Sequence, residues 1–276
     1  MHWQSTRFRV DLSRPKVMGI VNVTPDSFSD GGRYASTRLA LAHCEELVVQ
    51  GAHILDIGGE SSRPGTPPVT LEEERARVIP VVRDAVTLGI PISVDTYKPE
   101  IMREALDLGA DIINDIWGLR REGAMDAIAS HPNCGVCIMH MHGEPSTMQR
   151  SPMEGDAVPQ VREFLRMHSD ALRSRGVDAA RIAWDPGIGF GKTVEQNFAL
   201  LARQSQLLDA GYPLVVGWSR KSSLGNVTGL PVNERLAPSI AAALLAVERG
   251  AHVVRVHDVK ETLAALKVRA AMELEQ

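Results

Sequence analysis

The sequence predicts a single-domain α/β protein, a (β/α)8 barrel of the TIM type, and three observations support this prediction. First, the 276 residues suit one barrel domain, which commonly needs ~250 residues. Second, eight short apolar runs alternate with helical patterns along the chain. Third, these runs are continuously apolar, as expected for parallel strands covered on both faces. We expect one domain over residues 1–276, with the barrel over about 16–273; a doubly wound open sheet is the alternative.

Each predicted strand ends where the chain turns polar. The strands are expected at residues 17–22, 53–57, 92–94, 111–113, 135–139, 181–184, 213–216 and 252–256. A further short strand near residues 8–11 is expected to cover the barrel floor. Helices are expected at about 36–50 and 233–249, and another ends near residue 174. Capping boxes predict three more helix starts, at Thr70 with Glu73, Thr193 with Gln196 and Asp258 with Glu261.

Composition and charge exclude several classes of function. The chain is 44% hydrophobic and 23% charged with a net charge of −4, so no nucleic-acid or membrane surface is expected. The N-terminus lacks a signal-peptide pattern, and no apolar run approaches ~20 residues. Three cysteines favour a reducing cytoplasm. Cys134 and Cys137 have CxxC spacing, but in a strand they face opposite sides, so a metal or redox pair is not expected.

Polar side chains follow nearly every predicted strand. In such a barrel the carboxyl ends of the strands share one face, and that face holds the active site. Convergence of so many polar groups predicts a small-molecule site. The groups are Asn22, Ser62 with Arg63, Asp95, Asn114, His140 with His142, Asp185, Ser219 with Arg220 and Lys221, and Arg255 with His257.

The charges of these groups are divided between two sides of the predicted mouth. Asp95, Asn114 and Asp185 supply acceptors, which suit a heterocycle with a guanidine-like N–C–N edge. The other side is cationic, and phosphate sites in these barrels favour the last two strand ends. A ligand with a nitrogenous ring and a phosphorylated end is therefore predicted. The cationic residues are Arg63, Arg220, Lys221, Arg255 and His257.

Two motifs indicate other sites but fit them poorly. Gly187 to Thr193 is similar to a phosphate-binding P-loop, yet three residues separate Gly187 from Gly191 where four are needed. His140 and His142 lie on one predicted strand face, as in metal-dependent barrel hydrolases. Asp185 and His257 could complete a zinc site, but the basic cluster around them disfavours a bare dication.

Eight motifs in order, from about residue 16 to the last helix, resemble the dihydropteroate synthase family. Ser62 stands where the family often has threonine, and Trp218 replaces a smaller residue, which could narrow that side of the mouth. The motifs are Gly19-Ile-Val-Asn-Val-Thr-Pro-Asp-Ser-Phe-Ser-Asp-Gly31, Asp56-Ile-Gly-Gly-Glu-Ser-Ser-Arg-Pro-Gly65, Ser93-Val-Asp-Thr96, Ile113-Asn-Asp115, Met139-His-Met141, Asp185-Pro-Gly-Ile-Gly-Phe-Gly-Lys192, Ser219-Arg-Lys-Ser222 and Arg255-Val-His-Asp258.

The resemblance implies a transferase that joins 4-aminobenzoate to 6-hydroxymethyl-7,8-dihydropterin pyrophosphate in folate biosynthesis. It implies pterin contacts at Asp95, Asn114, Asp185 and Lys221, of which Asp95, Asp185 and Lys221 are the catalytic candidates, with Met139 and Val256 as further substrate contacts. It implies pyrophosphate contacts at Ser62, Arg63, Arg255 and His257, and Mg²⁺ on Asn22. Mg²⁺ commonly takes one protein oxygen, with waters and phosphate oxygens completing its shell.

The chemistry of this reaction favours a dissociative, SN1-like path through a pterin cation that Asp95 stabilises, because aminobenzoate is a weak nucleophile. Phe28 and Pro64 would close over aminobenzoate, with Phe190, Lys221 and Ser219 as further contacts, and sulfonamides should compete there. The resemblance also implies a homodimer. The alternatives are a methyltetrahydrofolate-dependent methyl-carrier type domain, which would share the pterin contacts, and a binding paralogue without catalysis.

Overall fold

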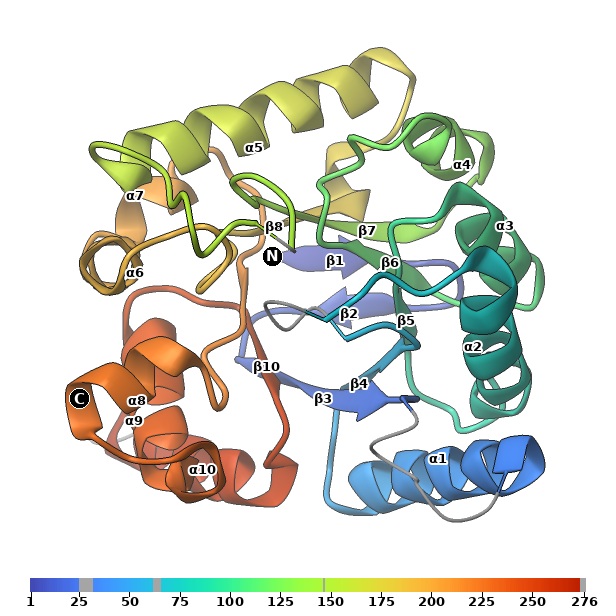
Figure 1. The fold of residues 1–276 in the computed structure, drawn as a ribbon, viewed down its shortest axis with the longest axis horizontal. Coiled ribbons are helices and arrows are strands. Elements are labelled where there is room, and N and C mark those ends of the chain that lie inside the picture. The colour runs from blue at the N-terminus through green and yellow to red at the C-terminus, as the bar shows by residue number, and fades with distance from the viewer. Residues whose placement is uncertain (25–31, 62–65, 146, 274–276) are drawn as a thin grey trace.

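The structure, a computed structural model, describes residues 1–24, 32–61, 66–145 and 147–273, with only the backbone described for residues 32–35 and 273. Parallel strands occupy the centre of the molecule and helices surround them (Figure 1). This arrangement confirms the predicted (β/α)8 barrel. The barrel strands are β3 (Lys16–Asn22), β4 (Ile54–Gly58), β5 (Ile92–Asp95), β6 (Ile112–Asp115), β7 (Gly135–Met139), β8 (Ile182–Asp185), β9 (Val215–Val216) and β10 (Val253–Val256).

Helices connect successive strands, close to the predicted positions. They are α1 (Gly32–Val49), α2 (Leu71–Ala85), α3 (Pro99–Asp107), α4 (Ala124–Ser130), α5 (Ala157–Ser174), α6 (Val194–Ala202), α7 (Ser205–Leu208), α8 (Ser222–Thr228), α9 (Leu236–Glu248) and α10 (Val259–Glu273), with short 3-10 turns η2 (Ala179–Arg181) and η3 (Val232–Glu234). None of the helices in the described ranges has the length and apolar content that a membrane crossing requires.

The predicted capping boxes have three different outcomes. At α6 the box is complete, because Thr193 and Gln196 each accept the other's backbone N–H. At α2 the Thr70 hydroxyl accepts the Glu73 N–H at 3.2 Å. At α10 the Asp258 carboxylate binds the Arg220 guanidinium instead. Asp258 therefore binds a side chain distant in sequence, whereas the motif predicted a capping box with Glu261.

The barrel closes between β8 and β9, which share less backbone pairing than the other neighbouring strands. The strand order is β8-β7-β6-β5-β4-β3-β10-β9, with every neighbouring pair parallel. One isolated bridge, Trp184 to Leu214, joins the two ends of this order. β9 is shorter than the predicted strand at 213–216, because this seam has a bridge rather than a ladder.

An apolar plug fills the amino-terminal end of the barrel. β1 (His2–Gln4) and β2 (Arg9–Asp11) pair antiparallel, which extends the single strand expected near residues 8–11 into a hairpin. The Trp3 side chain is fully buried, and its Nε1–H donates to the Arg181 carbonyl oxygen at 2.9 Å. The plug and the strand residues above it, here called the floor cluster, are Trp3, Val10, Leu12, Met18, Ile54, Ile112, Cys137, Ala183, Val215 and Val253.

The main core lies between the outer face of the barrel and the helices. It includes Val17 and Val21 of β3, which alternate with the inward-facing Met18. Cys134 belongs to this outer core, whereas Cys137 belongs to the floor cluster. The two thiols therefore face opposite sides, as predicted, and all three cysteines are free and buried.

Candidate active site

The interior of the barrel changes from apolar to polar or charged within two residues along several strands. Ile54 belongs to the floor cluster and Asp56 follows it on the same side of β4. The same step occurs from Ile112 to Asn114, Ala183 to Asp185 and Val253 to Arg255. With Asp95 and Lys221, the polar members of this layer form what we call the mouth cluster: Asp56, Asp95, Asn114, Asp185, Lys221 and Arg255.

Arg255 binds two carboxylates at the centre of the mouth cluster. Its Nε donates to Asp56 Oδ2 at 2.6 Å and its Nη2 donates to Asp95 Oδ2 at 2.8 Å. Burial raises the pKa of Asp95 to about 7, although the Arg255 charge opposes this shift. The two carboxylates in turn raise the pKa of Arg255 against the effect of its burial. This largely buried guanidinium is tolerated because it is paired and hydrogen-bonded.

Asp185 and Lys221 form the other side of the mouth cluster. Asp185 Oδ1 accepts the Gly187 N–H at 2.7 Å, and burial raises the pKa of this carboxyl. Burial and the nearby Arg255 charge lower the pKa of Lys221 to about 8. Its Nζ lies 4.2 Å from the centre of the Phe190 ring. The cation–π contact joins the predicted pterin and aminobenzoate sides of the mouth.

Ser219 and His257 form a hydrogen-bonded pair beside Arg255. Ser219 Oγ accepts the His257 backbone N–H at 3.2 Å and lies 2.9 Å from His257 Nδ1. Burial, together with the charges of Arg220 and Arg255, lowers the pKa of His257 to about 3. His257 was predicted to be cationic, and this prediction is wrong near neutral pH: the imidazole is a neutral hydrogen-bonding group. Arg220 is neutralised in part by Asp258.

The structure does not support the P-loop or the two-histidine metal site. Lys192 is buried, and its Nζ contacts the carbonyl oxygens of Gly187 and Phe190 at 2.8 and 3.1 Å. The same ammonium lies 2.9 Å from His140 Nδ1, and burial beside it lowers the pKa of His140 to about 2. His142 is exposed. Within the described ranges, no group of three or more His, Cys, Asp or Glu could hold a metal ion.

The remaining predicted residues have different positions. Met139 is buried with Phe190 in a small apolar cluster, whereas Val256 packs in the outer core. Trp218 also belongs to the outer core and stacks obliquely on Phe198, so its bulk lies away from the mouth. Asn22 ends β3 opposite Gly58. Phe28, Ser62, Arg63 and Pro64 lie outside the described residues.

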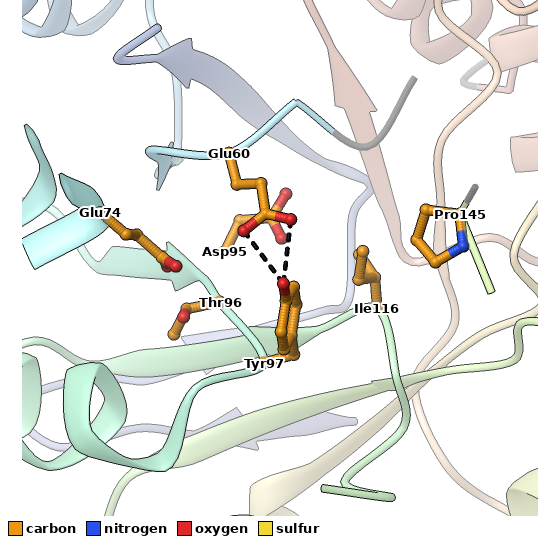
Figure 2. Close-up of a pocket in the computed structure, with 7 residues that line it drawn as sticks. All are labelled: Glu60, Glu74, Asp95, Thr96, Tyr97, Ile116 and Pro145. Carbon is orange, nitrogen blue, oxygen red and sulfur yellow. Dashed lines mark hydrogen bonds between the residues drawn. The ribbon is translucent and has the colours of Figure 1, made fainter. Parts of the chain in front are cut away.

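A pocket beside Asp95 contains acidic residues that the sequence reading did not identify. Its lining comprises Glu60, Glu74, Asp95, Thr96, Tyr97, Ile116 and Pro145, and Figure 2 shows the Glu60 carboxylate facing the Tyr97 hydroxyl. Tyr97 donates to Glu60 Oε1 at 2.9 Å. Lys98 binds both Glu60 and Glu74 through Nζ. These residues tie the start of the loop after β4 to α2 and to the end of β5.

Asp56 is the mouth residue that the sequence reading missed, and a signal for it was present. It stands inside an apolar strand, two residues after Ile54, which is the spacing that places both side chains on one face. Asp56 is fully buried, with Oδ2 accepting from Arg255 and from Asn114 Nδ2. Within the described part of the chain, Asp56 Oδ1 and Asn114 Oδ1 are buried acceptors without a partner. Such acceptors are suited to binding ligand N–H groups.

Comparison with known proteins agrees with this geometry. The profile of the pterin-binding enzyme family matches residues 18–257. A dihydropteroate synthase of Neisseria meningitidis serogroup B is 49% identical over 276 residues, covering 98% of this chain and 97% of that protein. The solved dihydropteroate synthase of Burkholderia cenocepacia, complexed with 7,8-dihydropteroate, is 50% identical with a TM-score of 0.90, covering 99% of this chain and 97% of that one. That of Yersinia pestis, in a sulfonamide drug complex, is 43% identical with a TM-score of 0.93, covering 99% of each chain.

The match extends over nearly the whole chain and includes every strand that contributes to the mouth cluster. The chain therefore belongs to the dihydropteroate synthase family of pterin-binding enzymes.

Proposed function

We propose that this chain joins 4-aminobenzoate to 6-hydroxymethyl-7,8-dihydropterin pyrophosphate, forming 7,8-dihydropteroate and releasing pyrophosphate in folate biosynthesis. The observation that supports this most directly is the mouth cluster, where Asp95, Asn114 and Asp185 present acceptors beside Arg255 and Lys221. A pterin has a matching N–C–N edge of N–H donors. Membership of the family supports the same reaction.

The electrostatics of the mouth favour a dissociative substitution. Loss of pyrophosphate leaves a methylene cation delocalised over the pterin ring, and the carboxylate of Asp95 at the mouth is assigned to stabilise it. The protein supplies no covalent nucleophile in this scheme. Aminobenzoate then attacks through its amine, and the new C–N bond replaces the broken C–O bond.

The pyrophosphate side is assigned to Arg255 and His257, with Ser62 and Arg63 as predicted partners outside the described residues. Because His257 is neutral and its Nδ1 meets Ser219, its Nε2 is the ring atom that remains for a phosphate oxygen. A Nε2–H donor would bind that oxygen without adding charge. Arg255 then supplies the positive charge on this side.

Mg²⁺ fits this site as a substrate-borne ion. The described residues provide no cluster of acidic or imidazole ligands for a cation bound by protein alone. A single amide oxygen from Asn22 at the end of β3 suits a magnesium ion whose other ligands are phosphate oxygens and waters. When bound, such an ion neutralises negative charge on the leaving pyrophosphate.

Aminobenzoate is assigned to the side of the mouth that carries Phe190, Lys221 and Ser219. The ring of Phe190 offers an apolar wall and Lys221 a positive charge for the aminobenzoate carboxylate. Phe28 and Pro64 are predicted to complete the pocket. A sulfonamide has the size and the amine of aminobenzoate, so we propose that this chain is inhibited by sulfonamides, in line with the Yersinia pestis complex.

A homodimer is also part of the proposal. Leu236 and Leu245 of α9 and Val268 and Met272 of α10 are large apolar side chains that the single chain leaves exposed. The two helices pack against each other and lie on the same side of the barrel (Figure 1). Cytoplasmic location remains a prediction, consistent with three free thiols.

The test is pyrophosphate release from the pterin substrate, measured with and without aminobenzoate and with and without Mg²⁺. We expect dihydropteroate formation only when all components are present, with one pyrophosphate released for each dihydropteroate formed. Deuterium at the pterin methylene should give a normal secondary isotope effect if the carbon becomes trigonal before attack. Tight pterin binding without product would refute the transferase assignment, and an isotope effect of unity would refute the dissociative path alone.

A further inference from the structure

The starting observation is a carboxylate inside the barrel with no access to solvent. Asp56 is fully buried in β4, one layer above the floor cluster. Burial of an ionised carboxylate is costly unless it is paired and hydrogen-bonded. Its pairing comes from Arg255, whose Nε donates to Oδ2 at 2.6 Å. Asp56 is therefore paired with a cation from a strand nearly two hundred residues away.

The same oxygen fixes a second side chain. Asn114 Nδ2 donates to Asp56 Oδ2 at 3.0 Å. Because this oxygen also accepts from Arg255 Nε, it acts as an acceptor, and the amide nitrogen is the end of Asn114 that can face it. The amide oxygen of Asn114 must then face away from Asp56. Within the described ranges that oxygen is buried and has no partner.

From this geometry we infer that Asp56 is a positioning residue for specificity: it locks the Asn114 amide with its oxygen toward the ligand, so that the site selects a ring carrying an N–H donor there. The inference rests on the proposed function, because it assumes that a pteridine occupies the mouth cluster. It adds that discrimination between an amino group and an oxygen on that ring depends on the orientation that Asp56 gives to the Asn114 amide. Arg255, held by the same Asp56 oxygen, is positioned at the same time.

The substitution Asp56→Asn tests the orientation of the Asn114 amide, because it keeps the size and shape of the side chain at position 56. In Asp56→Asn, the new amide can either accept from or donate to Asn114, so the Asn114 amide is free to turn over. Two ligands then report its orientation: a 6-hydroxymethylpterin, with an exocyclic amino group, and the corresponding lumazine, with oxygen at that position. We expect the unmodified chain to prefer the pterin. Asp56→Asn should reduce the ratio of the two dissociation constants about tenfold, a change of about 1.4 kcal/mol.

A matched control is available at the opposite end of the barrel. Asp111 is also fully buried and also pairs with an arginine, Arg7, but it lies beside the floor. Asp111→Asn loses a comparable buried ion pair and should leave the ligand ratio unchanged. In turnover, Asp56→Asn should raise the KM for the pterin substrate more than Asp111→Asn does.

The outcomes distinguish this inference from the proposed function. A pterin that binds the unmodified chain, with an unchanged ratio in Asp56→Asn, overturns the inference alone. Failure of the unmodified chain to bind any pteridine overturns the proposed function. If Asp56→Asn does not fold, the amide protons of Asn114 in the unmodified chain give a second measurement by NMR. Their continued protection with pterin bound supports the inference, whereas a nuclear Overhauser effect from them to the ligand overturns it.

Discussion

The floor and the mouth of this barrel are built from the same eight strands but satisfy opposite requirements. At the floor, polar groups are paired: the Trp3 Nε1–H meets the Arg181 carbonyl oxygen, and the Arg181 guanidinium donates to the carbonyl oxygens of Cys134, Pro132 and Ile128. At the mouth, Asp56 and Asn114 each keep a buried acceptor without a partner in the described part of the chain. The floor stabilises the fold, and the mouth retains binding capacity at some cost in stability.

Among substitutions at the mouth and at the floor, the largest loss of activity is expected at Asp95. Asp95→Ala removes the exposed edge of the mouth cluster but leaves Arg255 paired with Asp56. We expect kcat to fall roughly 10²–10³-fold, as for loss of a preorganised electrostatic group, with little change in the midpoint of thermal unfolding. Steady-state kinetics and calorimetry on the same preparation test both parts. A variant with the original kcat would refute the role assigned to Asp95.

Trp3 is the corresponding test at the floor. Trp3→Ala removes a fully buried indole from the plug and should lower the free energy of unfolding by about 3–5 kcal/mol. At temperatures where the variant stays folded, kcat should remain close to its original value. Trp3→Phe serves as the control, because it keeps most of the packing and loses only the bond to Arg181. Denaturant titration measures the cost, and a large loss of kcat in folded Trp3→Ala would show that the two ends are coupled.

Two histidines at the floor predict how stability depends on pH. His53 Nδ1 accepts the Val17 N–H at 3.0 Å, and His252 Nδ1 accepts the Leu214 N–H at 3.1 Å. Both pKa values are lowered by burial, so the unfolded chain binds protons that the folded chain does not. Their stabilising contribution is complete above about pH 6.5 and declines as pH falls, by up to about 1.4 kcal/mol per pH unit for each histidine.

The variants His53→Asn and His252→Asn keep an acceptor near the position of Nδ1 and remove the titration. Each should flatten the dependence of unfolding free energy on pH below about pH 6.5. His257→Asn is the control at the mouth. Because the pKa of His257 is also lowered, this variant should likewise show a weaker dependence of unfolding free energy on pH than the unmodified chain. Unlike the floor variants, it should also lose activity. An unchanged slope in both floor variants would contradict the role of burial in these pKa shifts.

Much of the mouth could be predicted from the sequence because it depends on position along a strand. Asp95, Asn114 and Asp185 follow apolar runs directly, and the barrel topology brings them together. Asp56 was missed because it lies inside an apolar run, where only its two-residue spacing from Ile54 reveals the side it faces. The charge state of His257 could not be predicted, because it depends on burial beside Arg220 and Arg255, which come from different strand ends.

The smallest effect is expected at the rim, where the ion pair between Arg220 and Asp258 belongs to neither region. The Arg220 side chain is 42% exposed and that of Asp258 is 17% exposed, so water and salt screen their attraction. Asp258→Asn should therefore change the free energy of unfolding by about 1 kcal/mol or less. Arg220 contributes to the low pKa of His257, and its charge is less compensated in this variant. The pKa of His257 should then fall slightly further, which NMR titration of the imidazole would measure. A rise in that pKa would contradict the opposing effects of Asp258 and Arg220 on His257.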